Sequence, residues 1–197
     1  MSLKIGIDLN DVVRDYSRNF IKYFKKGINS SFDENNVDFY TNDMKILLPF
    51  NSDEQYERFV YVDYPFELYG KCPAVERNLS RDLNHWVQFD LYDKDVEVFF
   101  TSPMEGDLTI QSSYFFLASI GSRIREVYFP VDSSTIWDKC DVLITANPRF
   151  FENKKDGKKI VKINKDYNTN LNADLNYDSL NDLINDKEFI NKIKQDD

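Results

Sequence analysis

The feature that most constrains the fold is an alternation of short apolar runs with segments of helical periodicity. Runs this short, rich in Val, Ile and Phe and bounded by turn residues, are typical of strands buried on both faces of a parallel sheet. They cover residues 3–9, 96–102, 125–131, 140–148 and 158–164. The alternation predicts an α/β fold, a three-layer, Rossmann-like parallel sheet with right-handed crossover connections.

Helical periodicity fills most of the chain between these runs. The spacing of apolar residues predicts helices over 12–26, 74–92, 109–122 and 177–194. Gly27 ends the first pattern, and Asp178 or Ser179 is placed to cap the last one, which is amphipathic.

Residues 28–72 have a different character, because turn formers and acids alternate there with aromatics. Within them, Ser52 precedes a short helical pattern and has Gln55 three positions on, which is typical of a helix N-terminus. We therefore expect an α/β core formed by 1–27 and 73–197, with 28–72 as an inserted, cap-like segment. The insert is either a small lid over a site or a long connection packed on the core.

Composition narrows the classes of partner and cofactor. The net charge is −9 and the basic residues are scattered, which argues against a nucleic-acid partner. The sequence has no apolar run long enough to span a membrane and no secretory signal pattern, so we expect no membrane partner and a soluble, cytoplasmic protein. The abundance of Asn and Lys suggests a low-GC bacterial or viral origin. Cys72 and Cys140 match no metal-binding spacing, and the single histidine, His85, cannot supply a zinc cage.

Candidate functional residues gather where the predicted strands end. In a parallel α/β sheet, ligands bind in the crevice outside the carboxyl ends of the strands. The polar residues at those ends are Asp8, Asn10, Thr101, Ser102, Thr145 and Asn147. One ionisable group therefore converges with several hydroxyls and amides at one edge of the predicted sheet.

Three of these strand ends resemble motifs of the haloacid dehalogenase (HAD) superfamily. "IGIDLNDVV" is similar to the first motif, an apolar strand that ends in Asp-x-Asp, and "VFFTSP" to the second. "CDVLITANPRF", followed by "GKKIVKINKDYN", is similar to the fourth motif and the strand after it. The resemblance is closest to the 5′(3′)-deoxyribonucleotidase-like phosphatases. It covers most of the chain outside 28–72, where such proteins carry a small helical cap.

The resemblance implies phosphoryl transfer through an aspartyl-phosphate, with Mg²⁺ as the cofactor. Asp8 would be the nucleophile and a metal ligand, and Thr101 would bind the transferring phosphoryl group. Ser102 and Lys139 are further candidates for phosphate binding. Position 10 would carry the general acid–base, and the substrate would be a phosphorylated small molecule such as a nucleotide.

The departures from the pattern fall on functional positions. Asn10 cannot cycle a proton at neutral pH, which removes help typically worth about 10²–10⁴-fold. Thr145 and Ala146 stand where two metal-binding acids are expected, so a magnesium site at Asp8 would be weak or absent. The segment that should supply a lysine offers Ser134 or Thr135, with Lys139 close by in the sequence.

Some charged residues near these motifs allow two interpretations. Asp11 is either the N-cap of the helix that follows or a substitute acid or metal ligand. Arg14 and Arg149 follow the first and fourth strand ends. Each is either an exposed or salt-bridged helix residue or the source of the missing positive charge.

These observations leave three functional hypotheses. The first is a HAD-like, nucleotidase-related protein with a degenerate site, which has little or no phosphoryl-transfer activity but binds a phosphorylated small molecule or a protein partner. The second is an active magnesium-dependent phosphatase or 5′-nucleotidase that uses Asp8, with Asp11, Asp141 or Lys139 compensating for the losses. The third is a metal-free hydrolase of the dehalogenase type. The altered positions favour the first.

Overall fold

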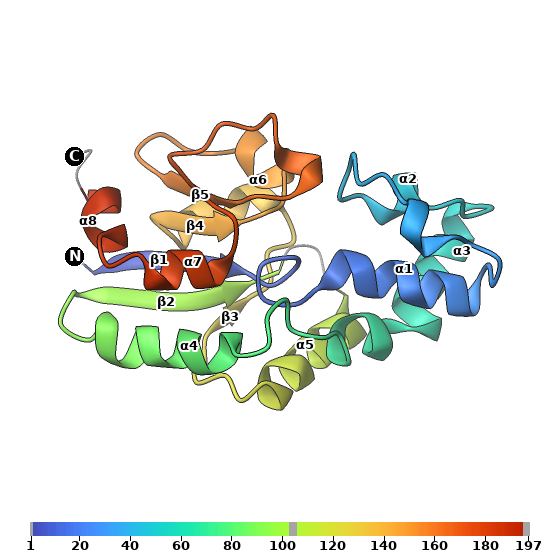
Figure 1. Cartoon of the computed structure of the whole chain (residues 1–197), viewed down its shortest axis with the longest axis horizontal. Helices are drawn as coiled ribbons and strands as arrows, with labels where there is room; N and C mark the ends of the chain where they lie inside the picture. The colour runs from blue at the N-terminus through green and yellow to red at the C-terminus, as the bar shows by residue number, and fades with distance from the viewer. Residues whose placement is uncertain (1, 103–105, 195–197) are drawn as a thin grey trace.

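The computed structural model describes residues 2–102 and 106–194 of the 197-residue chain. Its centre is a parallel sheet in the order β3-β2-β1-β4-β5-β6 (Figure 1). The strands are β1 (Leu3–Asp8), β2 (Val96–Thr101), β3 (Val127–Tyr128), β4 (Val142–Thr145), β5 (Lys159–Ile163) and β6 (Leu175–Tyr177). The predicted α/β class with a Rossmann-like parallel sheet is confirmed.

The observed strands match the predicted ones best at the centre of the sheet and least at its edges. The edge strand β3 keeps only two residues of the predicted 125–131 run. The other edge strand, β6, was not predicted, because Leu175–Tyr177 contains an asparagine between two partly buried residues and forms no apolar run. An edge strand is exposed on one side, so it needs less apolar sequence than a central one.

The helices of the core are α1 (Tyr16–Gly27), α4 (Leu79–His85), α5 (Asp107–Ser119), α6 (Arg149–Glu152), α7 (Leu180–Asn185) and α8 (Phe189–Lys194). The predicted terminal helix is therefore two helices, with a break after α7 at Asp186. Ser179 caps α7 by accepting a hydrogen bond from the amide of Asp182 at 3.0 Å. No helix of the described residues combines the length and the hydropathy that crossing a bilayer requires.

Side chains from the two faces of the sheet enter two separate apolar clusters. Ile5 and Ile7 face the cluster that contains the buried residues of α4, α5, α7 and α8. Phe99 and Leu143 face the other cluster, where Trp137 and Phe150 cover the sheet. This alternation is what a strand buried on both faces requires, and it accounts for the three layers.

The inserted segment contains α2 (Met44–Leu47) and α3 (Asp53–Arg58), and its aromatic side chains form a third cluster. That cluster includes Phe20 and Phe24 of α1, with Phe24 at 4.9 Å from Phe50 and Phe20 at 5.3 Å from Phe59 between ring centroids. Figure 1 shows α1 running away from the sheet beside the insert. The insert thus packs on α1. The domain boundaries expected from the sequence stay a prediction.

The chain leaves the core and returns to it through adjacent backbone. The amide of Asp15 donates to the carbonyl of Pro73 at 2.9 Å, and the amide of Val75 donates to the carbonyl of Val13 at 3.0 Å. We call these two paired stretches, 13–15 and 73–75, the neck. The chain between them is covalently connected to the core by these two segments.

Ser52 has the capping role that the sequence predicts. Its hydroxyl accepts a hydrogen bond from the amide of Gln55 at 3.2 Å, at the start of α3. We expect Ser52→Ala to lower the free energy of unfolding by about 1 kcal/mol, because the amide of Gln55 then loses its acceptor. Urea titration measures this, with Ser30→Ala, at an exposed serine of the same insert, as a control that should change stability by less than about 0.5 kcal/mol.

Candidate functional site

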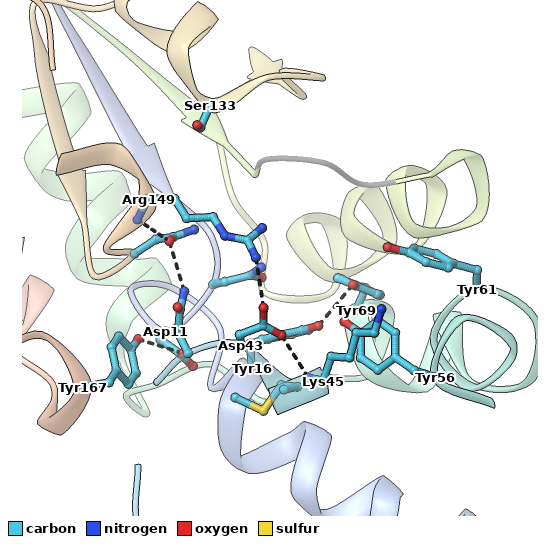
Figure 2. Close-up of a pocket in the computed structure, with 14 residues that line it drawn as sticks. Asp11, Tyr16, Asp43, Lys45, Tyr56, Tyr61, Tyr69, Ser133, Arg149 and Tyr167 are labelled. Carbon is cyan, nitrogen blue, oxygen red and sulfur yellow. Dashed lines mark hydrogen bonds and ion pairs between the residues drawn. The ribbon is translucent and has the colours of Figure 1, made fainter. Parts of the chain in front are cut away.

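A cavity of about 250 Å³ lies between the carboxyl edge of the sheet and the insert (Figure 2). The core contributes Asn10 and Asn147, which follow β1 and β4. Five tyrosines, which come from α1, the insert and the loop after β5, also line it: Tyr16, Tyr56, Tyr61, Tyr69 and Tyr167. The cavity therefore occupies the position where α/β proteins bind ligands, but its wall is mainly phenolic and amide.

Asp8 lies at the end of β1, completely buried, and is not among the residues that line this cavity. One carboxylate oxygen accepts a hydrogen bond from the Thr145 hydroxyl at 2.7 Å, and the other from the amide of Asn10 at 3.3 Å. Burial raises the pKa of Asp8 to about 7, against the opposing effects of Thr145, Asn10 and Arg14. The carboxyl group is enclosed by protein on all sides.

The second strand end lies directly beside Asp8. Thr101 pairs with Asp8 in the register of β1 and β2, and both Thr101 and Ser102 are buried. The Thr101 hydroxyl finds no hydrogen-bond partner within the described ranges. Pro103 of the predicted motif lies outside the described residues. The structure thus brings together Asp8, Asn10, Thr101 and Ser102, as the sequence predicts.

Arg14 is the unexpected member of this group. Of the two interpretations of Arg14, the exposed helix residue is wrong, since Arg14 is fully buried and precedes α1. Its Nε donates to the Oδ1 of Asn10 at 2.7 Å, and its Nη2 to the hydroxyl of Ser102 at 3.2 Å. The guanidinium thus contacts the polar ends of both β1 and β2.

The other side of the Arg14 guanidinium faces α5 and the end of the insert. Nη1 donates to the Ser113 hydroxyl at 2.7 Å and to the carbonyl of Tyr69 at 3.3 Å. The guanidinium carbon lies 4.9 Å from the centre of the Tyr69 ring. A planar cation with five donors suits such a site, because it bonds several acceptors in fixed directions at once.

Asp11 is also buried, and its φ of 59° places it in the left-handed region that Asp tolerates in turns. Its carboxylate accepts hydrogen bonds from the amide of Ser17 at 2.8 Å, from the Ser17 hydroxyl and from the Tyr167 hydroxyl at 2.9 Å. The N-cap residue of α1 is Asp15, so Asp11 is not the N-cap by position. It nevertheless bonds an amide of the first turn, which is what a cap does.

Comparison with known proteins bears on the fold. No protein-family model matches the chain, and a search of curated proteins finds no significant match. Among solved structures, the chain is similar to a protein described as a haloacid dehalogenase-like hydrolase from Burkholderia xenovorans LB400. The TM-score is 0.58, with 11% sequence identity, over 96% of this chain and 98% of that one. The fold is HAD-like.

Other predicted residues of the HAD-like site lie elsewhere. Lys139 is exposed, precedes β4, does not line the cavity, and places its Nζ 5.6 Å from the centre of the Tyr128 ring. Asp141 also precedes β4 and pairs with Lys158 at 2.8 Å. Asp141 accepts a hydrogen bond from the amide of Lys4 at the start of β1, so it lies toward the edge of the sheet away from Asp8.

The fourth strand end does reach the cavity. Arg149 lines it and forms an ion pair with Asp43 of the insert at 3.1 Å. The Oδ1 of Asn147 accepts from the Nδ2 of Asn42 at 3.0 Å and from the amide of Arg149 at 3.0 Å. Asn147 is thus a turn residue before α6 and a link to the insert as well.

The residues at the predicted site do not fit a magnesium ion well. Mg²⁺ is usually held by one or two carboxylates together with substrate phosphates and water, in a near-octahedral arrangement of oxygens. Within 2–102 and 106–194, no group of three or more His, Cys, Asp or Glu side chains could hold a metal ion. Both oxygens of Asp8 accept protein hydrogen bonds. The positive charge of Arg14 is also nearby, where it opposes the rise in the pKa of Asp8 that burial causes.

Sequence reasoning missed the tyrosines and Asn42. The insert is visibly rich in aromatics, but most of them enter its own cluster, and no local pattern distinguishes those that face the cavity. Asn42 meets Asn147 across 105 residues, a pairing that only the folded chain specifies.

Proposed function

We propose that this HAD-like protein binds a nucleotide-related small molecule in the cavity and has little or no phosphoryl-transfer activity. The observation that supports this most strongly is the burial of Asp8. A nucleophile has to reach within about 3–3.5 Å of the atom it attacks. The cavity does not extend to Asp8, and both carboxylate oxygens already accept hydrogen bonds.

The protonation of the site supports the same proposal. With a pKa of about 7, a large share of Asp8 is protonated at neutral pH, and a protonated carboxyl is a weak nucleophile. Asn10 carries no titratable proton, and its Oδ1 is held by Arg14. On this proposal, Asp8 is a weak nucleophile and Asn10 cannot act as a general acid or base.

The ligand class follows from the cavity wall and from the resemblance to nucleotidase-like phosphatases. Tyrosine rings are stacking surfaces for planar rings, and the amides of Asn10, Asn42 and Asn147 offer directional hydrogen bonds. A nucleotide, or a part of one such as a nucleoside, is the class that we propose. A cytoplasmic location and the absence of nucleic-acid and membrane partners remain part of the proposal.

The experiment that tests the proposal separates turnover from binding. Hydrolysis of p-nitrophenyl phosphate and of nucleoside 5′-monophosphates is measured with Mg²⁺ for the wild type and for Asp8→Asn. We expect no turnover that depends on Asp8, whereas calorimetry should detect binding of a nucleoside or nucleotide. Turnover that disappears in Asp8→Asn would establish the alternative, an active phosphatase.

Restoring the second acid should not restore activity. We expect Asn10→Asp to show no phosphatase activity with Mg²⁺, because Asp8 stays enclosed and the new carboxylate bonds Arg14 rather than a leaving group. The same assay measures it, and a melting temperature within a few degrees of the wild type shows that the variant is folded. Activity in Asn10→Asp would mean that the loss of one acid, and not the enclosure of Asp8, limits the wild type.

A further inference from the structure

The charged groups of the cavity wall neutralise one another. Arg149 pairs with Asp43 at 3.1 Å, and Lys45 pairs with Asp53 at 2.9 Å. The Asp11 carboxylate accepts its hydrogen bonds from Ser17 and Tyr167. Among the described residues, those that line the cavity therefore include two acids and two cations, on a chain of net charge −9. Such a wall offers no surplus positive charge to a phosphate.

The cation close to Asp8, Arg14, is enclosed by protein. The resemblance puts the phosphoryl group beside Asp8 and Thr101. In this chain the Arg14 guanidinium joins Asn10 to Ser102 across that same edge, fully buried. A ligand in the cavity can approach this cation only if the surrounding side chains move.

Asn42 and Asn147, which join the insert to the core, both line the cavity. The Asn147 Oδ1 already accepts from Asn42 and from the amide of Arg149, so the Asn147 amide is held in one orientation. This leaves the Nδ2 of Asn147 as a donor and the Oδ1 of Asn42 as an acceptor. Neither atom has a hydrogen-bond partner in the described part of the chain. A donor and an acceptor on two residues that line the cavity can together bond a heterocycle that carries both an acceptor and a donor.

The remaining wall suits a flat, small ligand. Tyrosine rings lie on both the core side and the insert side of the cavity. Figure 2 shows Tyr167 beside Asp11, with Tyr56, Tyr61 and Tyr69 beyond Asp43. A volume of about 250 Å³ is below the roughly 300–1,000 Å³ of sites for drug-sized ligands. This favours a ligand no larger than a nucleoside.

We propose that the cavity binds an uncharged nucleobase-type heterocycle, as the free base or the nucleoside, and that it discriminates against the 5′-phosphate. The inference rests on the proposed function, which places a nucleotide-related ligand in this cavity. It adds that the ligand carries no phosphate and that Asn42 and Asn147 recognise its hydrogen-bonding edge.

Titration calorimetry without metal ions tests this with four nucleosides (uridine, cytidine, adenosine and guanosine) and their 5′-monophosphates. We expect at least one nucleoside to bind with a Kd about ten-fold or more below that of its monophosphate. Asn42→Ala should weaken that binding by about ten-fold, since it removes the acceptor and frees Asn147 to rotate. Asn51→Ala is the matched control, because it removes the same type of side chain at an exposed position of the insert that does not line the cavity, and it should retain binding.

The outcomes separate the two proposals. A monophosphate that binds as tightly as its nucleoside, or more tightly, overturns the inference and leaves the proposed function intact. A nucleoside that binds Asn42→Ala as well as the wild type overturns the role of the amide pair. If the folded protein binds none of the eight compounds, the proposed function falls together with the inference. Unfolding curves of both variants establish that they are folded.

Discussion

Replacing Arg14 with methionine should lower the free energy of unfolding by about 3–5 kcal/mol, the largest effect that we expect from any single substitution in this chain. Methionine fills similar space but donates no hydrogen bonds. It leaves Asn10, Ser102 and Ser113 without the donor that each now has. Ser102 and Ser113 are fully buried, so water cannot readily replace the guanidinium beside them.

Urea titration with a matched control tests this prediction. Arg18→Met changes the same residue type four positions on, at an exposed side chain, and should alter stability by less than about 0.5 kcal/mol. Arg14→Lys should also destabilise substantially, because one ammonium group cannot reach partners on three sides. If Arg14→Met were as stable as the wild type, the guanidinium would be solvated and the cavity would extend to Asp8. The main support for the proposed function would then be lost.

The ionisation of Asp8 should make the protein less stable as the pH rises from about 4 to about 7. Burial raises the pKa of Asp8 to about 7 in the folded chain, from an ordinary value of 3.8. Between these values the folded state holds a proton that the unfolded state has released. Raising the pH therefore favours unfolding. The full difference is on the order of 4 kcal/mol, and it no longer changes above pH 7, where both states are ionised.

Comparison with Asp8→Asn isolates this effect. The amide keeps the shape of the side chain but does not ionise, so the stability of the variant minus that of the wild type should increase with pH over this window. Asp141→Asn is a control of opposite sign. Burial acts to raise the pKa of Asp141, but hydrogen bonds from Lys158 and from the amide of Lys4 outweigh it, so its pKa is lowered. Asp141 should therefore stabilise the protein as the pH rises through the acid range. A pH-independent difference between wild type and Asp8→Asn would show that the Asp8 carboxylate is solvated.

The sequence predicts the centre of this fold well because central strands have a strong local signal. β4 is buried along its whole length, and β1, β2 and β5 are buried toward their carboxyl ends, whereas Lys4 and Glu97 are exposed at the start of β1 and β2. Strand segments that are buried on both faces have to be mostly apolar. The convergence of Asp8, Asn10 and Thr101 follows from the same signal, since parallel strands bring their carboxyl ends to one edge.

The parts that the sequence does not predict depend on contacts between distant residues. The burial of Arg14 results from acceptors that lie 55 to 99 residues away, and an arginine that follows two valines has no local mark of this. The start of α1 shifts to Tyr16 because Asp11 adopts a left-handed turn that bonds Ser17 and Tyr167. Periodicity alone cannot distinguish such a turn from the first turn of a helix.

The neck has a consequence for how such a chain can be altered or acquired. Residues 13–15 and 73–75 are hydrogen-bonded neighbours, so the two ends of the segment between them lie about one strand spacing apart. A unit whose ends are this close can be removed and bridged by a few residues with little strain in the sheet, and the same geometry tolerates its replacement by an unrelated unit. The better boundary for such a deletion, however, lies before α1. A deletion confined to 28–72 would leave Phe20 and Phe24 without the rings that cover them, whereas one that starts at residue 16 would take the whole aromatic cluster with it.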